Sequence, residues 1–135
     1  EWAADGSTAA GTYELMLREP AAPDSPLVLD WQPALEAALA DLRAGETPAV
    51  ISGAFHRGLA KAIAAVAARI GEPRIVLTGG CFQNLRLTEA ALAALRAGGH
   101  EPIFHRRVPP NDGGIALGQA VWAAWSQHGV IAPCA

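Results

Sequence analysis

The sequence predicts one α/β domain in which helices pack against a mixed sheet. Three observations support this fold class: an alternating apolar segment at residues 12–18, a long helical pattern at residues 48–70, and a strand–glycine–helix–glycine–strand order between residues 74 and 105. The chain has 135 residues, of which 51% are hydrophobic, and this is enough to form a core of its own.

Two short strands are expected in the first 30 residues. Residues 12–18 alternate between apolar and exposed types, and a period of two is typical of a strand with one covered face. The covered side would carry Tyr13, Leu15 and Leu17. A loop with three prolines follows, and Leu27–Leu29 is the second strand candidate.

Two helices are expected next. Asp30 is a suitable N-cap for a helix that begins at Trp31 and is ended by Gly45. The apolar face of this helix is marked by Leu35, Leu39 and Leu42.

The second helix runs from about Pro48 to Ile70 and is closed by Gly71. Three-to-four spacing predicts one buried stripe along it. The stripe consists of Phe55, Leu59, Ile63, Val66 and Ile70.

The second half of the chain predicts a pair of parallel strands. Arg74–Thr78 is expected to be a buried strand, and Pro102–His105 its neighbour. The connection between them is long enough for a crossover helix, Asn84–Ala97. Its inward residues would be Leu87, Ala91, Leu92 and Leu95. The last helix would run from about Gly113 to Gln127.

Two glycine pairs stand where a loop is expected to turn into a helix. They are Gly79-Gly80 and Gly113-Gly114. A helix N-terminus offers N–H groups and a positive dipole end, and glycine lets an anionic ligand approach the backbone. The sequence therefore suggests a phosphate-binding site, although an ordinary turn that needs positive φ explains the glycines equally simply.

Polar residues beside these turns have two interpretations each. Asn84 could bind a ribose or phosphate, or act as a helix N-cap. Asp112 could bind a metal or ribose, or act as an N-cap. Gln83 has no evident capping role. His56 could point at the site or at solvent. His105, next to Arg106-Arg107, could bring positive charge near phosphates or belong to a solvated strand end.

Charge and cysteine content exclude several classes of function. The net charge is −3 without a large basic cluster, which argues against a nucleic-acid partner. We find no apolar run of the length of a membrane span. The two cysteines, Cys81 and Cys134, are too few for a disulfide framework, and we expect free thiols in a reducing, cytoplasmic compartment. A small buried thiol is the expected state of Cys81.

Three motifs follow one another along the chain: Phe55-His56, Leu77-Thr78-Gly79-Gly80-Cys81-Phe82-Gln83-Asn84, and Val108-Pro109-Pro110-Asn111-Asp112-Gly113-Gly114-Ile115-Ala116-Leu117-Gly118-Gln119-Ala120. Together they resemble the C-terminal end of the HypF family, the carbamoyltransferases of nickel–iron hydrogenase maturation. The resemblance is clearest over about Leu29–Trp125 and is weak over residues 1–28. At position 81 the family usually has Val, where this chain has Cys.

The resemblance implies a fold and a set of site residues. Residues 1–135 would form the C-terminal lobe of a two-lobed, ribonuclease H-like domain of the actin and sugar-kinase type, as a fragment of a longer protein. Asp112 would bind a divalent iron or zinc ion held mostly by the other lobe, and His56 and His105 would line the site. The nucleotide-binding residues would be Gly79, Gly80, Gln83, Asn84, Gly113 and Gly114.

The resemblance also implies an activity. Family members convert carbamoyl phosphate and ATP into carbamoyl adenylate and carbamoylate the C-terminal cysteine of a partner protein. We expect the isolated chain to be inactive and to self-associate. The alternatives are a related transferase, acting in tRNA threonylcarbamoyl-adenosine synthesis or O-carbamoylation, and a non-catalytic module that binds a nucleotide or a partner.

Overall fold

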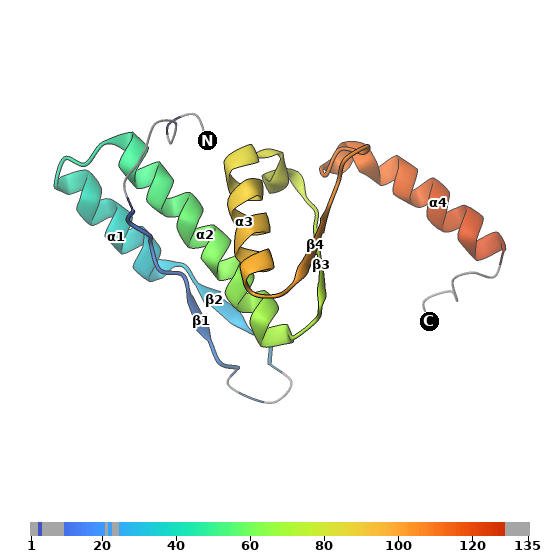
Figure 1. Ribbon diagram of the computed structural model, residues 1–135, viewed down its shortest axis with the longest axis horizontal. Coiled ribbons are helices and arrows are strands. Elements are labelled where there is room, and N and C mark those ends of the chain that lie inside the picture. Colours follow the sequence, from blue (N-terminus) through green and yellow to red (C-terminus); the bar gives the residue numbers. More distant parts are fainter. Residues whose placement is uncertain (1–2, 4–9, 21, 23–24, 129–135) are drawn as a thin grey trace.

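The computed structural model describes residues 3, 10–20, 22 and 25–128, and it has the predicted α/β architecture (Figure 1). Helices cover two small sheets, one antiparallel and one parallel. The elements of the described residues are β1 (Met16–Arg18), β2 (Val28–Asp30), α1 (Gln32–Arg43), α2 (Pro48–Ile70), β3 (Arg74–Leu77), the 3-10 helix η2 (Gly80–Gln83), α3 (Leu85–Ala97), β4 (Glu101–Phe104), the 3-10 helix η3 (Asp112–Gly114) and α4 (Ile115–Gln127).

The parallel sheet confirms the strand order expected from the sequence. β3 and β4 are neighbours, with Val76 opposite Ile103, and α3 connects them. The antiparallel sheet joins β1 to β2, with Leu17 opposite Leu29. Arg18 and Asp30 form an ion pair across the ends of these two strands.

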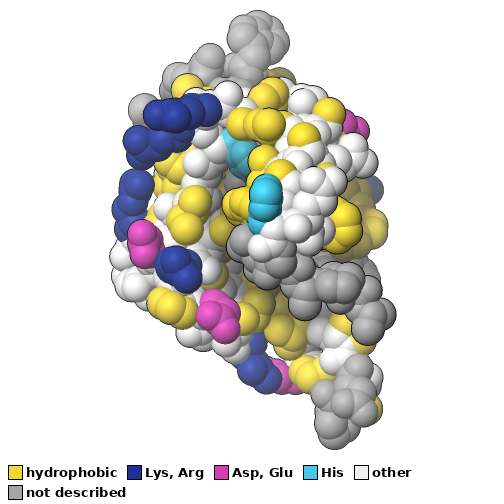
Figure 2. Space-filling view, turned by 90° about the vertical axis from the view of Figure 1, so that its right-hand side faces the viewer, with side chains coloured by type: hydrophobic (Ala, Val, Ile, Leu, Met, Phe, Trp, Pro, Cys, Tyr) yellow, Lys and Arg dark blue, Asp and Glu magenta, His cyan; other side chains and the backbone are white. Residues whose placement is uncertain are grey.

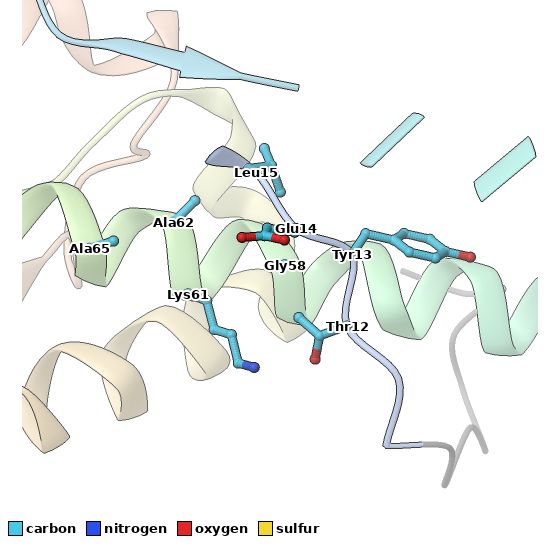
Figure 3. A pocket seen from close by; sticks show the side chains of 8 residues that line it. All are labelled: Thr12, Tyr13, Glu14, Leu15, Gly58, Lys61, Ala62 and Ala65. Atoms are coloured by element: carbon cyan, nitrogen blue, oxygen red, sulfur yellow. The ribbon is translucent and has the colours of Figure 1, made fainter. Parts of the chain in front are cut away.

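The first strand is shorter than predicted, because residues 12–15 lie along α2 instead of pairing in a sheet. Gly58 of α2 makes this crossing possible: a Cβ at this position would lie 2.3 Å from the Tyr13 carbonyl oxygen. Figure 3 shows Thr12 to Leu15 beside Gly58, around a pocket of about 360 Å³. The predicted alternation still holds, because Tyr13 is buried whereas Glu14 is exposed.

The central helix α2 has the bounds that the sequence predicts. Thr47 is its N-cap, with Oγ1 accepting from the Val50 N–H at 3.3 Å, and Gly71 ends it with a φ of 80°. By length and composition this helix is apolar enough to cross a membrane, so the expectation that no such run exists is wrong. In the structure it contacts α1, α3 and β1, the position of a core helix.

Two small apolar clusters hold the helices together. The larger lies between α2, α3 and the parallel sheet. The predicted inward residues of α3 are all buried, and three of them, Ala91, Leu92 and Leu95, belong to this cluster. Its buried members are Ala67, Leu77, Ala91, Leu92 and Leu95. The smaller lies between α1, α2 and the Tyr13 segment, and its buried members are Tyr13, Ala34 and Ala54.

Several predicted apolar faces are less buried than the sequence suggests. Leu35, Leu39 and Leu42 are exposed, because α1 packs through the small side chains of Ala34, Ala37 and Ala38. Small residues let helix backbones approach closely, so the bulky face of α1 is left outside the contact.

The predicted stripe of α2 is likewise only partly covered. Phe55 and Ile70, at its two ends, are exposed. The middle of the stripe lines an apolar groove of about 270 Å³ that Leu29 and Ile75 close from the side. β3 is also covered on one face only, since Val76 is exposed while Leu77 is buried.

The last helix projects away from the rest of the molecule (Figure 1) and buries none of its side chains. Residues 115–127 contain no charged side chain, and a helix that is apolar on all sides is normally covered by other protein. Figure 2 views the molecule from this end and shows hydrophobic side chains over much of the surface. The exposed large side chains of α4 are Ile115, Leu117, Val121, Trp122 and Trp125.

Candidate functional site

The two glycine turns meet at one place. The Gly79 N–H donates to the carbonyl oxygen of Pro110 at 2.7 Å, so the loop after β3 is bonded to the loop that precedes η3. Together the loops form an open cleft of about 360 Å³. Its lining residues are Thr78, Gly79, His105, Val108, Pro109, Pro110, Asn111, Asp112, Gly114 and Ile115.

In the first turn, the two glycines differ in what they require. Gly79 has φ 105° and ψ 157°, a conformation that essentially only glycine adopts. Gly80 does not have a positive φ, and a Cβ there would meet its nearest neighbour, Asn111 Cβ, only at 3.8 Å. The fold therefore needs glycine at position 79, whereas at position 80 it has room for a small side chain.

The first turn ends at Asn84, which is the N-cap of α3. Its Oδ1 accepts from the Leu87 N–H at 2.9 Å, so the capping interpretation of Asn84 is confirmed. Thr88 Oγ1 donates to the Phe82 carbonyl at 3.0 Å and ties the middle of the turn to α3. The 3-10 helix leaves its first N–H groups, those of Gly80 and Cys81, without a carbonyl inside the helix.

In the second turn, the cap is Asn111 and not Asp112. The Gly113 N–H donates to Asn111 Oδ1 at 3.0 Å, and the Gly114 N–H donates to the Asn111 carbonyl at 2.9 Å. Gly114 is needed for close packing, because a Cβ there would lie 2.8 Å from the Pro109 carbonyl oxygen. The N-cap interpretation of Asp112 is wrong, and its carboxylate is left exposed at the cleft.

The cleft also contains a histidine. His105 lines it, and its Nε2 lies 3.0 Å from Thr78 Oγ1. The neighbouring Arg106 places its guanidinium 5.1 Å from the centre of the Phe104 ring, a cation–π contact. An imidazole and a carboxylate thus lie at one cleft, together with turns rich in backbone N–H groups.

Not every predicted residue lines this cleft. Gly80, Gln83, Asn84 and Gly113 lie beside it, in the turns that form its walls, and are not among its lining residues. Their assignment to nucleotide binding stays a prediction. His56 is buried on α2 and contacts Asn84, so it lies behind the turn and does not line the cleft.

The cleft is only a partial metal site. Asp112 carboxylate and His105 imidazole are types of ligand that iron and zinc accept. Within the part of the chain that the structure describes, no group of three or more His, Cys, Asp and Glu residues could hold a metal ion. Asp112 as a metal ligand therefore stays a prediction, and such a site would need donors from elsewhere.

Cys81 is exposed, so the expectation of a buried thiol is wrong. Cys81 lies in the 3-10 helix η2, and its neighbour Phe82 packs against the core in its place. Cys134 lies outside the described residues.

Sequence reasoning missed three residues of the site. Asn111 forms the cap that was assigned to Asp112, Thr78 holds His105, and Thr88 anchors the first turn. Asn in the Pro-Pro-Asn-Asp string was a usable signal, because Asn is as good an N-cap as Asp. Thr78 acts through a contact with a residue far away in the sequence, and the contact of Thr88 with Phe82 follows no common capping pattern.

Comparison with known proteins shows which family the chain resembles. The family described as "Carbamoyltransferase, Kae1-like Domain, second subdomain" matches residues 1–119. Carbamoyltransferase HypF of Synechocystis is 37% identical over 93 residues, which cover 69% of this chain and 12% of that protein. The HypF of Rhodobacter capsulatus is 46% identical over 87 residues, 62% of this chain and again 12% of the relative.

A solved structure has the same fold. The crystal structure of a full-length HypF in a phosphate- and nucleotide-bound form has a TM-score of 0.78 and 31% sequence identity to this chain. The similarity covers 87% of this chain and 16% of that protein. The chain thus spans a small part of the length of the relatives that it matches.

Proposed function

Because this chain belongs to the HypF carbamoyltransferase family, as the second subdomain of the Kae1-like domain, we propose that its cleft is one half of a nucleotide site in a longer carbamoyltransferase. The observation that carries the proposal is the junction of the two glycine turns through Gly79 and Pro110. It brings the start of η2, with the N–H groups of Gly80 and Cys81, next to the Asn111 loop that borders the cleft. Unpaired N–H groups at a helix start are good ligands for phosphate.

The first turn would contribute backbone N–H groups to this nucleotide. At the start of η2 these are the N–H groups of Gly80 and Cys81, which precede the first hydrogen bond of that helix. Glycine at position 80 leaves the backbone open to a phosphate oxygen. The nucleotide-bound HypF relative supports the choice of ligand, since it has the same fold.

Asp112 and His105 would act together, because both line the cleft. A carboxylate beside a phosphate is unfavourable unless a cation lies between them. We therefore propose that Asp112 binds a divalent metal ion, with further donors from the rest of the enzyme. Donors from elsewhere would be needed, because the described residues contain no group of three or more metal-binding side chains.

The surface of α4 supports a role as one lobe of a larger enzyme. Leu117, Val121, Trp122 and Trp125 line an apolar groove of about 420 Å³ that reaches His105. A groove of this composition, next to the cleft, suits a contact with another lobe that would close over the nucleotide.

The full reaction that we propose is carbamoylation of the C-terminal cysteine of a partner protein in nickel–iron hydrogenase maturation. The substrates would be carbamoyl phosphate and ATP, with carbamoyl adenylate as the intermediate, and the reaction would take place in the cytoplasm. The chain would contribute nucleotide-binding groups rather than the complete active site, so residues 1–135 alone should be inactive.

The experiment is carbamoylation by the full-length protein that contains this chain. Purified enzyme is mixed with carbamoyl phosphate, ATP and the partner protein, and the partner's C-terminal peptide is followed by mass spectrometry. We expect a carbamoyl adduct that requires ATP, and none when residues 1–135 replace the full-length enzyme. An adduct that forms equally without ATP, or no adduct at all, would contradict the proposal.

A further inference from the structure

His56 is a buried titratable side chain that the proposed nucleotide site does not use directly. It is only 7% exposed and lies on α2, at the level where α3 begins. Its Nδ1 is 2.7 Å from the Ser52 carbonyl oxygen, and its Nε2 is 2.8 Å from Asn84 Nδ2. Both ring nitrogens therefore have a partner.

Only one assignment of donors and acceptors satisfies both hydrogen bonds of the His56 ring. A carbonyl oxygen only accepts, so Nδ1 carries the proton and donates to Ser52. Nε2 is then the acceptor for the Asn84 amide N–H. The orientation of the amide is fixed independently, because Asn84 Oδ1 accepts from the Leu87 N–H at 2.9 Å. Asn84 thus uses one side-chain atom to cap α3 and the other to contact α2.

Asn84 is also the residue at which the first glycine turn ends. Its N–H donates to the Cys81 carbonyl at 3.2 Å, and its carbonyl accepts from the Thr88 N–H at 3.0 Å. The other end of the turn is held by the bond from Gly79 to Pro110. The turn is therefore fixed at both ends, and His56 links Asn84 to α2 through a side-chain hydrogen bond.

We infer that His56 is a positioning residue for the nucleotide: it fixes Asn84, and through Asn84 the N–H groups of Gly80 and Cys81. The inference rests on the proposed function, because the ligand of the turn is taken to be a nucleotide phosphate. If the acceptor is removed, the Asn84 amide N–H loses its partner in a partly buried place and must move to find another. The turn then loses the geometry that suits a phosphate.

The test compares ATP binding by variants of the full-length protein. His56→Leu removes the acceptor and keeps an apolar side chain of similar size. His56→Gln keeps an acceptor, since a glutamine oxygen reaches about as far as Nε2. Asn84→Ser keeps a good N-cap but removes the amide that contacts His56. The matched control is Leu95→Val, a core change at the opposite end of α3.

We expect His56→Leu and Asn84→Ser each to weaken ATP binding by about fivefold or more, the effect of one hydrogen bond. The double variant should bind no more weakly than the weaker single variant, because both changes break one contact. His56→Gln should stay within about twofold of wild type, as expected when the one hydrogen bond is kept. Leu95→Val should lower the melting temperature and leave ATP affinity unchanged.

Wild-type affinity in a folded His56→Leu variant would overturn the inference, as would losses that add in the double variant. Should His56→Leu fail to fold, Asn84→Ser carries the test, because it keeps the cap. Absence of ATP binding in the wild-type protein would instead refute the proposed function, and the positioning role with it, before any variant is compared.

Discussion

The Gly79 N–H donates to the Pro110 carbonyl oxygen at 2.7 Å, and this bond joins two loops that belong to different helix starts. Each loop alone is an ordinary turn. Joined, they line one open cleft of about 360 Å³ between the starts of η2 and η3. The candidate site thus depends on a contact between backbone groups, so side-chain changes can alter ligand binding without breaking it.

The two glycines of the first turn should respond differently to alanine. Gly79→Ala places a side chain at φ 105°, and we expect it to lower the free energy of unfolding by about 1–3 kcal/mol. Gly80→Ala has room for its Cβ and should change stability by no more than about 0.5 kcal/mol. If Gly80 faces the nucleotide, Gly80→Ala will nevertheless weaken ATP binding in the full-length protein. Urea unfolding and ATP titration measure the two effects; equal ATP affinity would remove Gly80 from the site.

Gly58→Ala should destabilise the fold although alanine favours helix. The gain in helix propensity is about 1 kcal/mol, but the new Cβ would lie 2.3 Å from the Tyr13 carbonyl oxygen. The Thr12–Leu15 segment must move away, and overpacking of this kind costs about 1–3 kcal/mol. We therefore expect a net loss in the free energy of unfolding. Lys61→Ala, an exposed change one turn further along α2, is the control; a more stable Gly58→Ala variant would mean that the segment does not cross there.

The raised pKa of Tyr13 should make the free energy of unfolding decrease in alkaline solution. Burial, and then its hydrogen bond to Asp41 Oδ2 at 2.6 Å, raise the pKa of Tyr13 from 10.0 to about 12. Because the pKa of Tyr13 is higher in the folded than in the unfolded state, its protonated hydroxyl stabilises the fold fully below pH 10. This stabilisation is lost as the pH rises toward 12. Tyr13→Phe should remove this alkaline step and cost about 1 kcal/mol at neutral pH. Denaturant titrations at pH 8 to 11 measure the free energy of unfolding of both proteins. If it falls with pH equally steeply in wild type and in Tyr13→Phe, the burial of the hydroxyl is contradicted.

The isolated chain should self-associate through α4. Trp125 is 50% exposed, and the helix buries none of its side chains. Trp125→Glu should therefore shift residues 1–135 toward the monomer in sedimentation equilibrium while leaving the melting temperature nearly unchanged. Arg96→Glu, on the exposed end of α3, is the control for a change of charge. Self-association that is insensitive to Trp125→Glu would place the contact on another apolar surface, such as the leucines of α1.

The sequence by itself determined where the main helices begin and end and which strands are neighbours. Thr47 with Pro48, and Gly71 at the other end, define α2 through local capping, and Asn84 defines the start of α3 in the same way. The strand–glycine–helix–glycine–strand order was enough to predict the parallel β3–β4 pair. These features depend on neighbours within a few residues, and such interactions are visible in a single sequence.

Only the tertiary structure decided which faces are covered and what the polar residues contact. The spacing of apolar residues marks the apolar face of a helix but does not show which element packs on it. In α1 the predicted leucines are exposed, whereas Ala34 is buried. Likewise, no local pattern shows that His56 reaches Asn84 or that Gly79 reaches Pro110. Both contacts join residues that lie far apart in the sequence, so they depend on how the helices and the parallel sheet pack together rather than on any one segment.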